Sequence, residues 1–252
     1  MTFGEHLEVL RRMLFRVLAI VGVLMVAVFC VREPVFTFIL APSRPGFLLF
    51  FEGEEVQLIA TELGSQFMAH LSVSLCLGIL LASPYILYEL FRFVSPALYE
   101  RERRLSLPLL LVSYALFVCG LLLSYYILFP VCFHFLATYR VSGSVVTMVT
   151  LDSYLSTFTT LTLLLGLVFQ LPVVAFILAR LGLVSSSLLS RYRRHAVLVI
   201  AITSAIITPP DALSLVLVCL PLYLLYEVSI LVVRLFYSSP RWHEDFTCMN
   251  TG

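Results

Sequence analysis

Long apolar runs alternate with short polar segments along most of the chain, and this alternation predicts helices that cross a membrane. A helix rises ~1.5 Å per residue, so roughly 20 apolar residues span a hydrocarbon core of about 30 Å. The run 196–207 offers only about 18 Å of helix, which is too short for an ordinary bilayer. The predicted spans are residues 13–30, 67–93, 105–136, 154–181, 196–207 and 212–236.

The polar segments between these runs predict loops on alternating sides of the membrane. Residues 1–12 form an amphipathic helix, in which Thr2 and Glu5 have the spacing of a capping box. In the turn before the last span, proline ends the helix at 208 and Asp211 is placed to cap the next one. Residues 1–252 are one membrane domain with external loops at 31–64 and 138–153, cytoplasmic loops at 94–104 and 182–195, and a cytoplasmic tail at 237–252.

Composition and charge agree with an all-α multi-pass membrane protein. Hydrophobic residues make up 61% of the chain and charged residues 12%, which excludes a soluble domain. All sixteen basic residues are arginines, and only Arg32, Arg44 and Arg140 fall on the side of the external loops. Because cytoplasmic loops carry the excess of basic residues, both termini should be cytoplasmic. The net charge of +1 gives no sign of nucleic-acid binding.

The chemistry along the chain is sparse. The six cysteines lack CxxC spacing, and the five histidines are scattered over different spans, so we expect no metal, disulfide framework or cofactor. HExxH, GxSxG and glycine-rich phosphate motifs are missing from the sequence, so we do not expect an enzyme. A secondary transporter, or another six-span protein without a catalytic site, is the alternative, although a transporter often has two similar halves and none is evident.

Three polar features stand out. Gln170 and Glu227 lie inside spans, where each should face protein or a water-filled recess. Each could form a hydrogen bond between helices of this chain, or bind a partner helix. The third feature is a set of surface carboxylates, for which salt bridges to nearby arginines are the alternative to binding a ligand. We favour salt bridges for Glu8 and Glu100; the other members are Glu5 and Glu102.

Several segments resemble the TatC subunit of the twin-arginine protein translocase. They are EHLEVLRRML, PYILYELFRFVSPALYERERR, GLVFQLPVV, IITPPDALS and LPLYLLYEVSI, in the family's order along nearly the whole chain. The resemblance implies six transmembrane helices in a concave arrangement with two short final helices. It also implies a receptor in the cell inner membrane that binds signal peptides with two consecutive arginines. Such a receptor recruits single-span TatA/TatB-type subunits, self-associates within a larger complex and exports folded proteins. An organellar membrane of related origin is the alternative location.

The resemblance assigns roles to particular residues. The family's main carboxylate falls on Glu102 and its aromatic neighbour on Phe93, with Leu98, Tyr99 and Arg104 in the same signal-peptide site. Gln170 falls on the polar position of the concave face, and the partner-helix region takes in Glu227, Pro209, Pro210 and Asp211.

One position departs from the family pattern. A second carboxylate is expected where this chain has Val9, and Glu8 stands one residue earlier. One residue is about 100° of helix rotation, so Glu8 does not automatically replace the missing group. We rank Glu8 above Glu5 as the substitute, because Glu5 has the capping role open to it.

Overall fold

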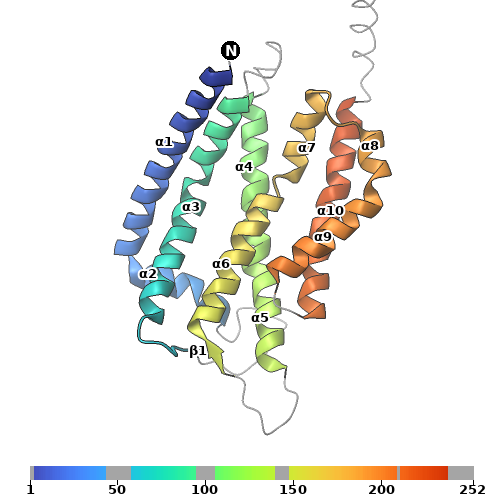
Figure 1. Ribbon diagram of the computed structural model, residues 1–252. Coiled ribbons are helices and arrows are strands. Elements are labelled where there is room, and N and C mark those ends of the chain that lie inside the picture. Colours follow the sequence, from blue (N-terminus) through green and yellow to red (C-terminus); the bar gives the residue numbers. More distant parts are fainter. Residues whose placement is uncertain (1–2, 44–57, 95–105, 140–147, 209–210, 238–252) are drawn as a thin grey trace, which may run out of the picture.

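The computed structural model describes residues 3–43, 58–94, 106–139, 148–208 and 211–237. Within these ranges the chain is almost entirely helical (Figure 1). The helices are α1 (Phe3–Cys30), α2 (Arg32–Ile39), α3 (Ser65–Val94), α4 (Ser106–Leu123), α5 (Phe129–Thr138), α6 (Leu151–Val168), α7 (Leu171–Arg180), α8 (Ser186–Arg191), α9 (Arg193–Ile207) and α10 (Ala212–Tyr237). A 3-10 turn (Ala41–Ser43), a π-helical turn (Ser124–Leu128) and two short strands, β1 (Leu58–Ile59) and β2 (Val149–Thr150), complete the described elements.

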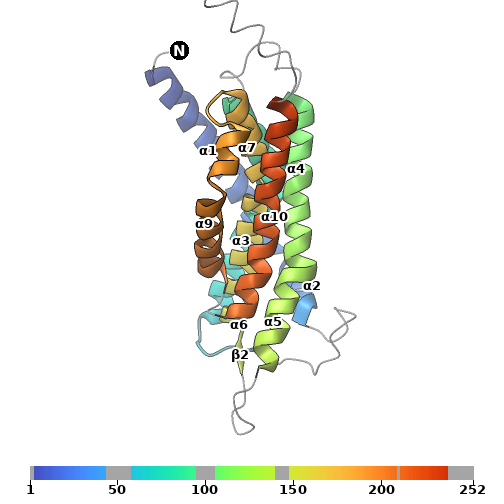
Figure 2. The ribbon, with the colours of Figure 1, turned by 90° about the vertical axis from the view of Figure 1, so that its right-hand side faces the viewer.

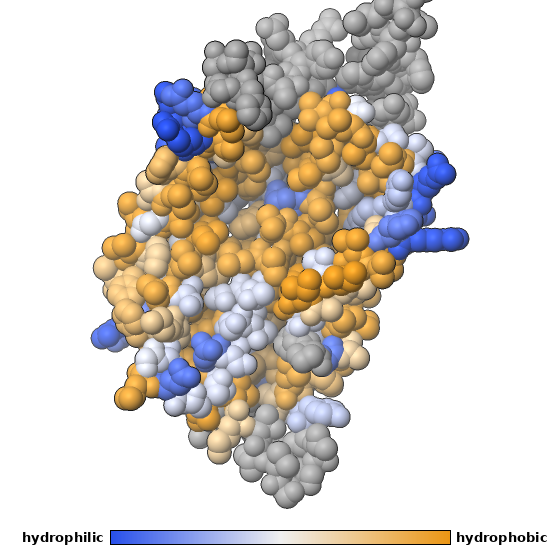
Figure 3. Space-filling view, in the orientation of Figure 1, coloured by the Kyte–Doolittle hydropathy of each residue, from blue (hydrophilic) through white to orange (hydrophobic). Residues whose placement is uncertain are grey.

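Five helical segments are long and apolar enough to cross a membrane. They are Leu7–Cys30, Ser65–Phe93, Leu107–Thr138, Leu151–Arg180 and Ala212–Leu235. Their outward surface is largely apolar, with hydrophilic residues gathered near the start of α1, around α8 and α9, and near α2 (Figure 3). These segments match five of the six predicted runs, and the chain is an all-α multi-pass membrane protein.

The remaining predicted span, 196–207, corresponds to α9, and it is short as expected. It has 15 residues, or about 22 Å of helix. The expectation that both final helices are short is wrong for the last one, because α10 continues for 26 residues and contains Pro221 within the helix. The apolar run after Asp211 has no polar break that would end it earlier. Of the two final helices, only α9 is therefore short, at 15 residues against 26 for α10.

The amphipathic segment at 1–12 is not a separate helix. It continues without a break into the first span as α1, 28 residues long. α1 packs along α3 (Figure 1), and Figure 2 shows the start of α1 leaning away from the rest of the bundle. The start of α1, the end of α3, the start of α4 and the end of α10 all lie at one end of the bundle (Figure 1). Successive spans therefore run in opposite directions, as the predicted positions of the loops require.

Toward the opposite end of the bundle, α2 is held by tyrosines of the π-helical turn and of α6. Tyr125 donates a hydrogen bond to the Phe38 carbonyl at 2.7 Å, and Tyr154 donates one to the Ile39 carbonyl at 2.9 Å. Both carbonyls belong to the last turn of α2, where helix carbonyls lack partners within the helix. β1 and β2 pair in parallel, which joins the two predicted external loops. The loop at 31–64 is therefore ordered in its described parts.

α4 and α6 approach closely because a glycine stands on each helix. A Cβ atom on Gly120 would lie 2.8 Å from Phe169 Cγ and 3.0 Å from the Leu165 carbonyl oxygen. A Cβ atom on Gly166 would lie 2.8 Å from Phe117 Cε2. Small residues allow close helix packing in membranes, where helix association relies on van der Waals contact rather than on the hydrophobic effect.

We expect Gly120→Ala to lower the stability of the protein in detergent by about 1 kcal/mol or more, because overpacking a helix contact costs about 1–3 kcal/mol. Thermal unfolding of the purified chain measures the change. Gly22→Ala on α1 is the matched control, since a Cβ atom there has no neighbour within 4 Å. Equal unfolding midpoints for the two variants would show that the α4–α6 contact is not tight.

Candidate functional site

The first site residue, Glu8, lies on the exposed face of α1. Its Oε1 atom accepts a hydrogen bond from Arg12 Nη2 at 2.5 Å, one helical turn away. The two side chains are 53% and 67% exposed, so this is a surface ion pair and stabilises the helix by at most about 1 kcal/mol. The salt bridge favoured for Glu8 is thus confirmed, and its carboxylate stays accessible to a ligand.

Phe93 lies in the last turn of α3 and is half-buried. Val9, where the second carboxylate was expected, is 47% exposed on α1. The remaining residues assigned to the signal-peptide site lie outside the described residues and stay predictions: Leu98, Tyr99, Glu102 and Arg104. Glu100, for which a salt bridge was favoured, lies outside them as well, as do Pro209 and Pro210 of the partner region.

The structure adds a carboxylate that sequence reasoning missed. Glu89 on α3 has a side chain only 6% exposed, and its Oε1 atom accepts a hydrogen bond from Tyr85 at 2.9 Å. Arg16 of α1 and Arg92 of α3 place guanidinium nitrogens 3.5 and 3.9 Å from the same oxygen. The available signal was a glutamate inside an apolar run with a tyrosine four residues before it and an arginine three residues after it, on one helix face.

Gln170 lies at the break between α6 and α7. α6 ends at Val168, and Pro172, in the first turn of α7, has no N–H to continue the hydrogen-bond ladder. The Gln170 Oε1 atom accepts from the buried Ser113 hydroxyl on α4, and its Nε2 atom donates to the Ser113 carbonyl at 3.1 Å. Gln170 therefore forms the interhelical hydrogen bond considered for it, and the amide uses both its donor and its acceptor.

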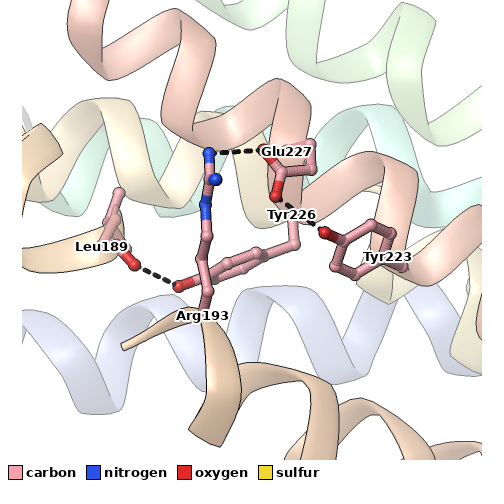
Figure 4. A network of polar contacts seen from close by, with 5 residues as sticks. All are labelled: Leu189, Arg193, Tyr223, Tyr226 and Glu227. Atoms are coloured by element: carbon pink, nitrogen blue, oxygen red, sulfur yellow. Dashed lines mark hydrogen bonds and ion pairs between the residues drawn. The ribbon is translucent and has the colours of Figure 1, made fainter. Parts of the chain in front are cut away.

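Glu227 is the centre of a polar network between α8, α9 and α10 (Figure 4). Its Oε2 atom accepts from Arg193 Nη2 at 2.9 Å, and its Oε1 atom accepts from Tyr223 at 3.0 Å. Beside it, Tyr226 donates to the Leu189 carbonyl at 2.8 Å, which ties α10 to α8. Glu227 is 31% exposed and Arg193 49%. The intrachain contact is present, and a role toward a partner helix stays a prediction.

Asp211 caps α10 as the sequence predicted. Its Oδ2 atom accepts a hydrogen bond from the Ser214 amide at 2.7 Å, which satisfies one of the free N–H groups at the start of the helix. Its Oδ1 atom and the Ser214 hydroxyl are buried without a partner among the described residues. In this chain Asp211 therefore fixes the position at which α10 begins.

Three glutamates of the described chain share one kind of contact. Glu8, Glu89 and Glu227 each lie against an arginine guanidinium, two of them across helices. A carboxylate is the natural partner of the planar guanidinium fork. In the part of the chain that the structure describes, no three His, Cys, Asp or Glu side chains come together as a metal site. The arrangement is suited to holding cationic groups.

Comparison with known proteins gives consistent matches over the chain. A family model described as "Sec-independent protein translocase protein (TatC)" matches residues 5–221. The TatC protein of Desulforapulum autotrophicum is 38% identical over 99% of this chain and 90% of its own length. TatCy of Bacillus subtilis is 35% identical over 94% of this chain and 90% of its own length. A crystal structure of the twin-arginine translocase receptor TatC superposes with a TM-score of 0.79 at 32% identity, covering 91% of this chain and 98% of that one.

We expect Arg193 and Glu227 to couple by about 0.5–1 kcal/mol in a double-mutant cycle of Arg193→Ala and Glu227→Ala, as partly exposed ion pairs do. Thermal unfolding in detergent supplies the four stabilities. Arg194→Ala with Glu227→Ala is the control cycle, because Arg194 forms no described ion pair although it is the next residue along α9. Additive effects of Arg193→Ala and Glu227→Ala would mean that the pair contributes nothing to holding α9 against α10.

Proposed function

Because the chain belongs to the TatC family of Sec-independent protein translocase proteins, we propose that it is the receptor subunit of a twin-arginine translocase. It binds twin-arginine signal peptides at its cytoplasmic face and recruits single-span TatA/TatB-type subunits, so that folded proteins are exported. It acts as a component of a larger complex and without a catalytic site. The family match favours this function over the secondary transporter considered from the span count.

The observation that carries the proposal is the pairing of carboxylates with guanidinium groups where α1 and α3 lie together. Glu8 and Glu89 already hold arginines of the chain itself. An arginine of a signal peptide offers the same planar fork, and lysine, as a point charge, does not replace it. Glu102 is the principal carboxylate of the proposed site, and Phe93 is its aromatic neighbour.

The cytoplasmic placement of this site follows from charge. Arginines outnumber other charges at the bundle end that holds the start of α1 and the end of α3, and the positive-inside rule places such an end in the cytoplasm. Both chain ends are then cytoplasmic in this proposal, and the family membership supports the cell inner membrane as the location.

In this proposal, the membrane-spanning helices of the TatA/TatB-type subunits bind at α9 and α10. α9 is shorter than an ordinary hydrocarbon core and leaves Val199, Ile202 and Ile206 60%, 53% and 76% exposed. Beside it, the first half of α10 lines an open apolar groove of about 530 Å³, formed by Ala212, Leu213, Val216, Leu217 and Leu220. A single apolar helix of a partner subunit would cover both surfaces. Glu227 and Gln170 are the polar groups that such a helix could reach.

We expect Glu102→Gln to weaken binding of a twin-arginine peptide about tenfold or more, because a hydrogen bond to a charged group contributes about 1.5–3 kcal/mol. Fluorescence anisotropy of a labelled peptide with the detergent-purified chain measures the affinity. Glu33→Gln, on the exposed face of α2 at the other end of the bundle, is the matched control. Unchanged affinity in Glu102→Gln would remove Glu102 from the site.

We expect a photo-crosslinking amino acid at Ile206 to capture a single-span TatA/TatB-type subunit in membranes. The side chain is 76% exposed on a helix too short to fill the bilayer. The control position is Val23, which is 69% exposed on α1 at the other side of the bundle. Equal capture from both positions would mean that α9 is not the preferred docking surface.

A further inference from the structure

The resemblance to TatC did not assign Glu89 to the signal-peptide site. In the structure Glu89 lies close to Phe93, which belongs to that proposed site. It stands five residues before the end of α3 at Val94, about 7.5 Å along the helix axis. Tyr85, Glu89 and Phe93 follow one another at intervals of four residues, so they lie along one face of α3. Glu89 is thus one turn deeper than the aromatic residue of the site. A long arginine side chain can cover such a depth while its backbone stays at the interface.

The Glu89 carboxylate is buried but only partly used. All three of its described contacts, from Tyr85, Arg16 and Arg92, involve Oε1. No hydrogen bond to Oε2 is found among the described residues. The guanidinium distances of 3.5 and 3.9 Å are longer than the ~2.7–2.9 Å of a strong charge-assisted hydrogen bond. A bidentate guanidinium would use both oxygens and would satisfy this carboxylate better than its present partners.

Arg16 is the partner that reaches Glu89 from another helix. Its side chain is 53% exposed, so the guanidinium remains in contact with the surroundings while its nitrogen lies near Oε1. A peptide guanidinium that takes the place of Arg16 would keep the buried carboxylate paired, so the exchange does not leave an uncompensated charge. Arg12, one turn earlier on α1, has its own carboxylate in Glu8. Arg16 therefore holds Glu89 loosely and can be replaced.

We propose that Glu89 is a second carboxylate that receives an arginine of the signal peptide, and that Arg16 occupies this position until the peptide displaces it. The inference rests on the proposed function, because it concerns the same ligand. It accounts for the absence of a carboxylate at Val9, since Glu89 supplies one from α3 on the helix that packs against α1. Arg16 then acts as an internal competitor for the peptide.

If Arg16 and the peptide compete for Glu89, substitutions at Glu89 and at Arg16 should change the affinity for the peptide in opposite directions. Glu89→Gln removes the charge but keeps the shape and an oxygen for the Tyr85 hydroxyl, so peptide binding should weaken about tenfold. Arg16→Gln removes the competitor, so peptide binding should strengthen about two- to fivefold, the factor that corresponds to a partly exposed ion pair. A structural role for the Arg16–Glu89 pair would instead make both variants bind more weakly. Misfolding cannot produce a gain in affinity.

The test uses the full chain in detergent and anisotropy of a labelled twin-arginine peptide, with a twin-lysine peptide alongside. In the double variant Arg16→Gln with Glu89→Gln, the gain from Arg16→Gln should disappear, because that gain acts through the carboxylate. Arg194→Gln is the control for loss of an arginine near the proposed cytoplasmic end. Size-exclusion chromatography shows that each variant remains folded and monodisperse.

The outcomes separate this inference from the function on which it rests. If the unmodified chain does not discriminate the twin-arginine from the twin-lysine peptide, the proposed function fails. If it does discriminate, but Arg16→Gln weakens binding, or Glu89→Gln leaves it unchanged, the receptor function stands and Glu89 is not an arginine site. A gain in Arg16→Gln that persists in the double variant likewise overturns the role of Glu89.

Discussion

The absence of water in the hydrocarbon core is the constraint on which the rest of this structure depends. A polar group there must find its partner within the protein, since an unsatisfied one costs several kcal/mol. Several long-range contacts meet this demand, while four buried side-chain atoms lack a partner among the described residues. Gln170 is satisfied by the hydroxyl and carbonyl of Ser113 across α4 and α6. In the predicted external loop at 31–64, Tyr125 and Tyr154 satisfy the last carbonyls of α2 in the same way. These contacts fix which helices lie together.

The same constraint explains where irregular backbone occurs. The backbone groups at the α6–α7 break find partners within the break itself, since the Gln170 amide donates to the Leu167 carbonyl and the Gln170 carbonyl accepts from the amides of Val173 and Val174. The start of α9 places Arg193 against Glu227 of α10, so the charge that accompanies a short helix is neutralised by its neighbour. The apolar outward face of α9 has no partner among the described residues, which makes that face the natural surface for another apolar helix.

The sequence allowed the apolar runs, the loop alternation, the short α9 and the cap at Asp211 to be predicted, because each depends on neighbours in the chain. It did not reveal that α1 is continuous from residue 3, since an amphipathic start and an apolar span share the same helical geometry. The pairing of β1 with β2 depends on segments about ninety residues apart, and no local signal marks it. Glu89 was missed for a related reason. Its importance comes from burial and from Arg16 on another helix, and a position within an apolar run reveals neither.

Glu8, Glu89 and Glu227 each hold an arginine of the chain, and in the proposed receptor function Glu89 exchanges its arginine for one of the ligand. An empty buried carboxylate is costly, because a charge at membrane depth without a partner loses its solvation. An internal arginine removes most of that cost, but it also competes with the ligand, so the affinity gained on binding is the difference between two similar contacts. Specificity need not suffer from this exchange. A planar bidentate ligand can replace a loosely held arginine, whereas a lysine that offers one point charge gains less over the internal partner. The weak geometry of the Arg16–Glu89 pair, compared with the 2.9 Å pair of Arg193 and Glu227, is what distinguishes a contact suited to exchange from one that holds two helices together.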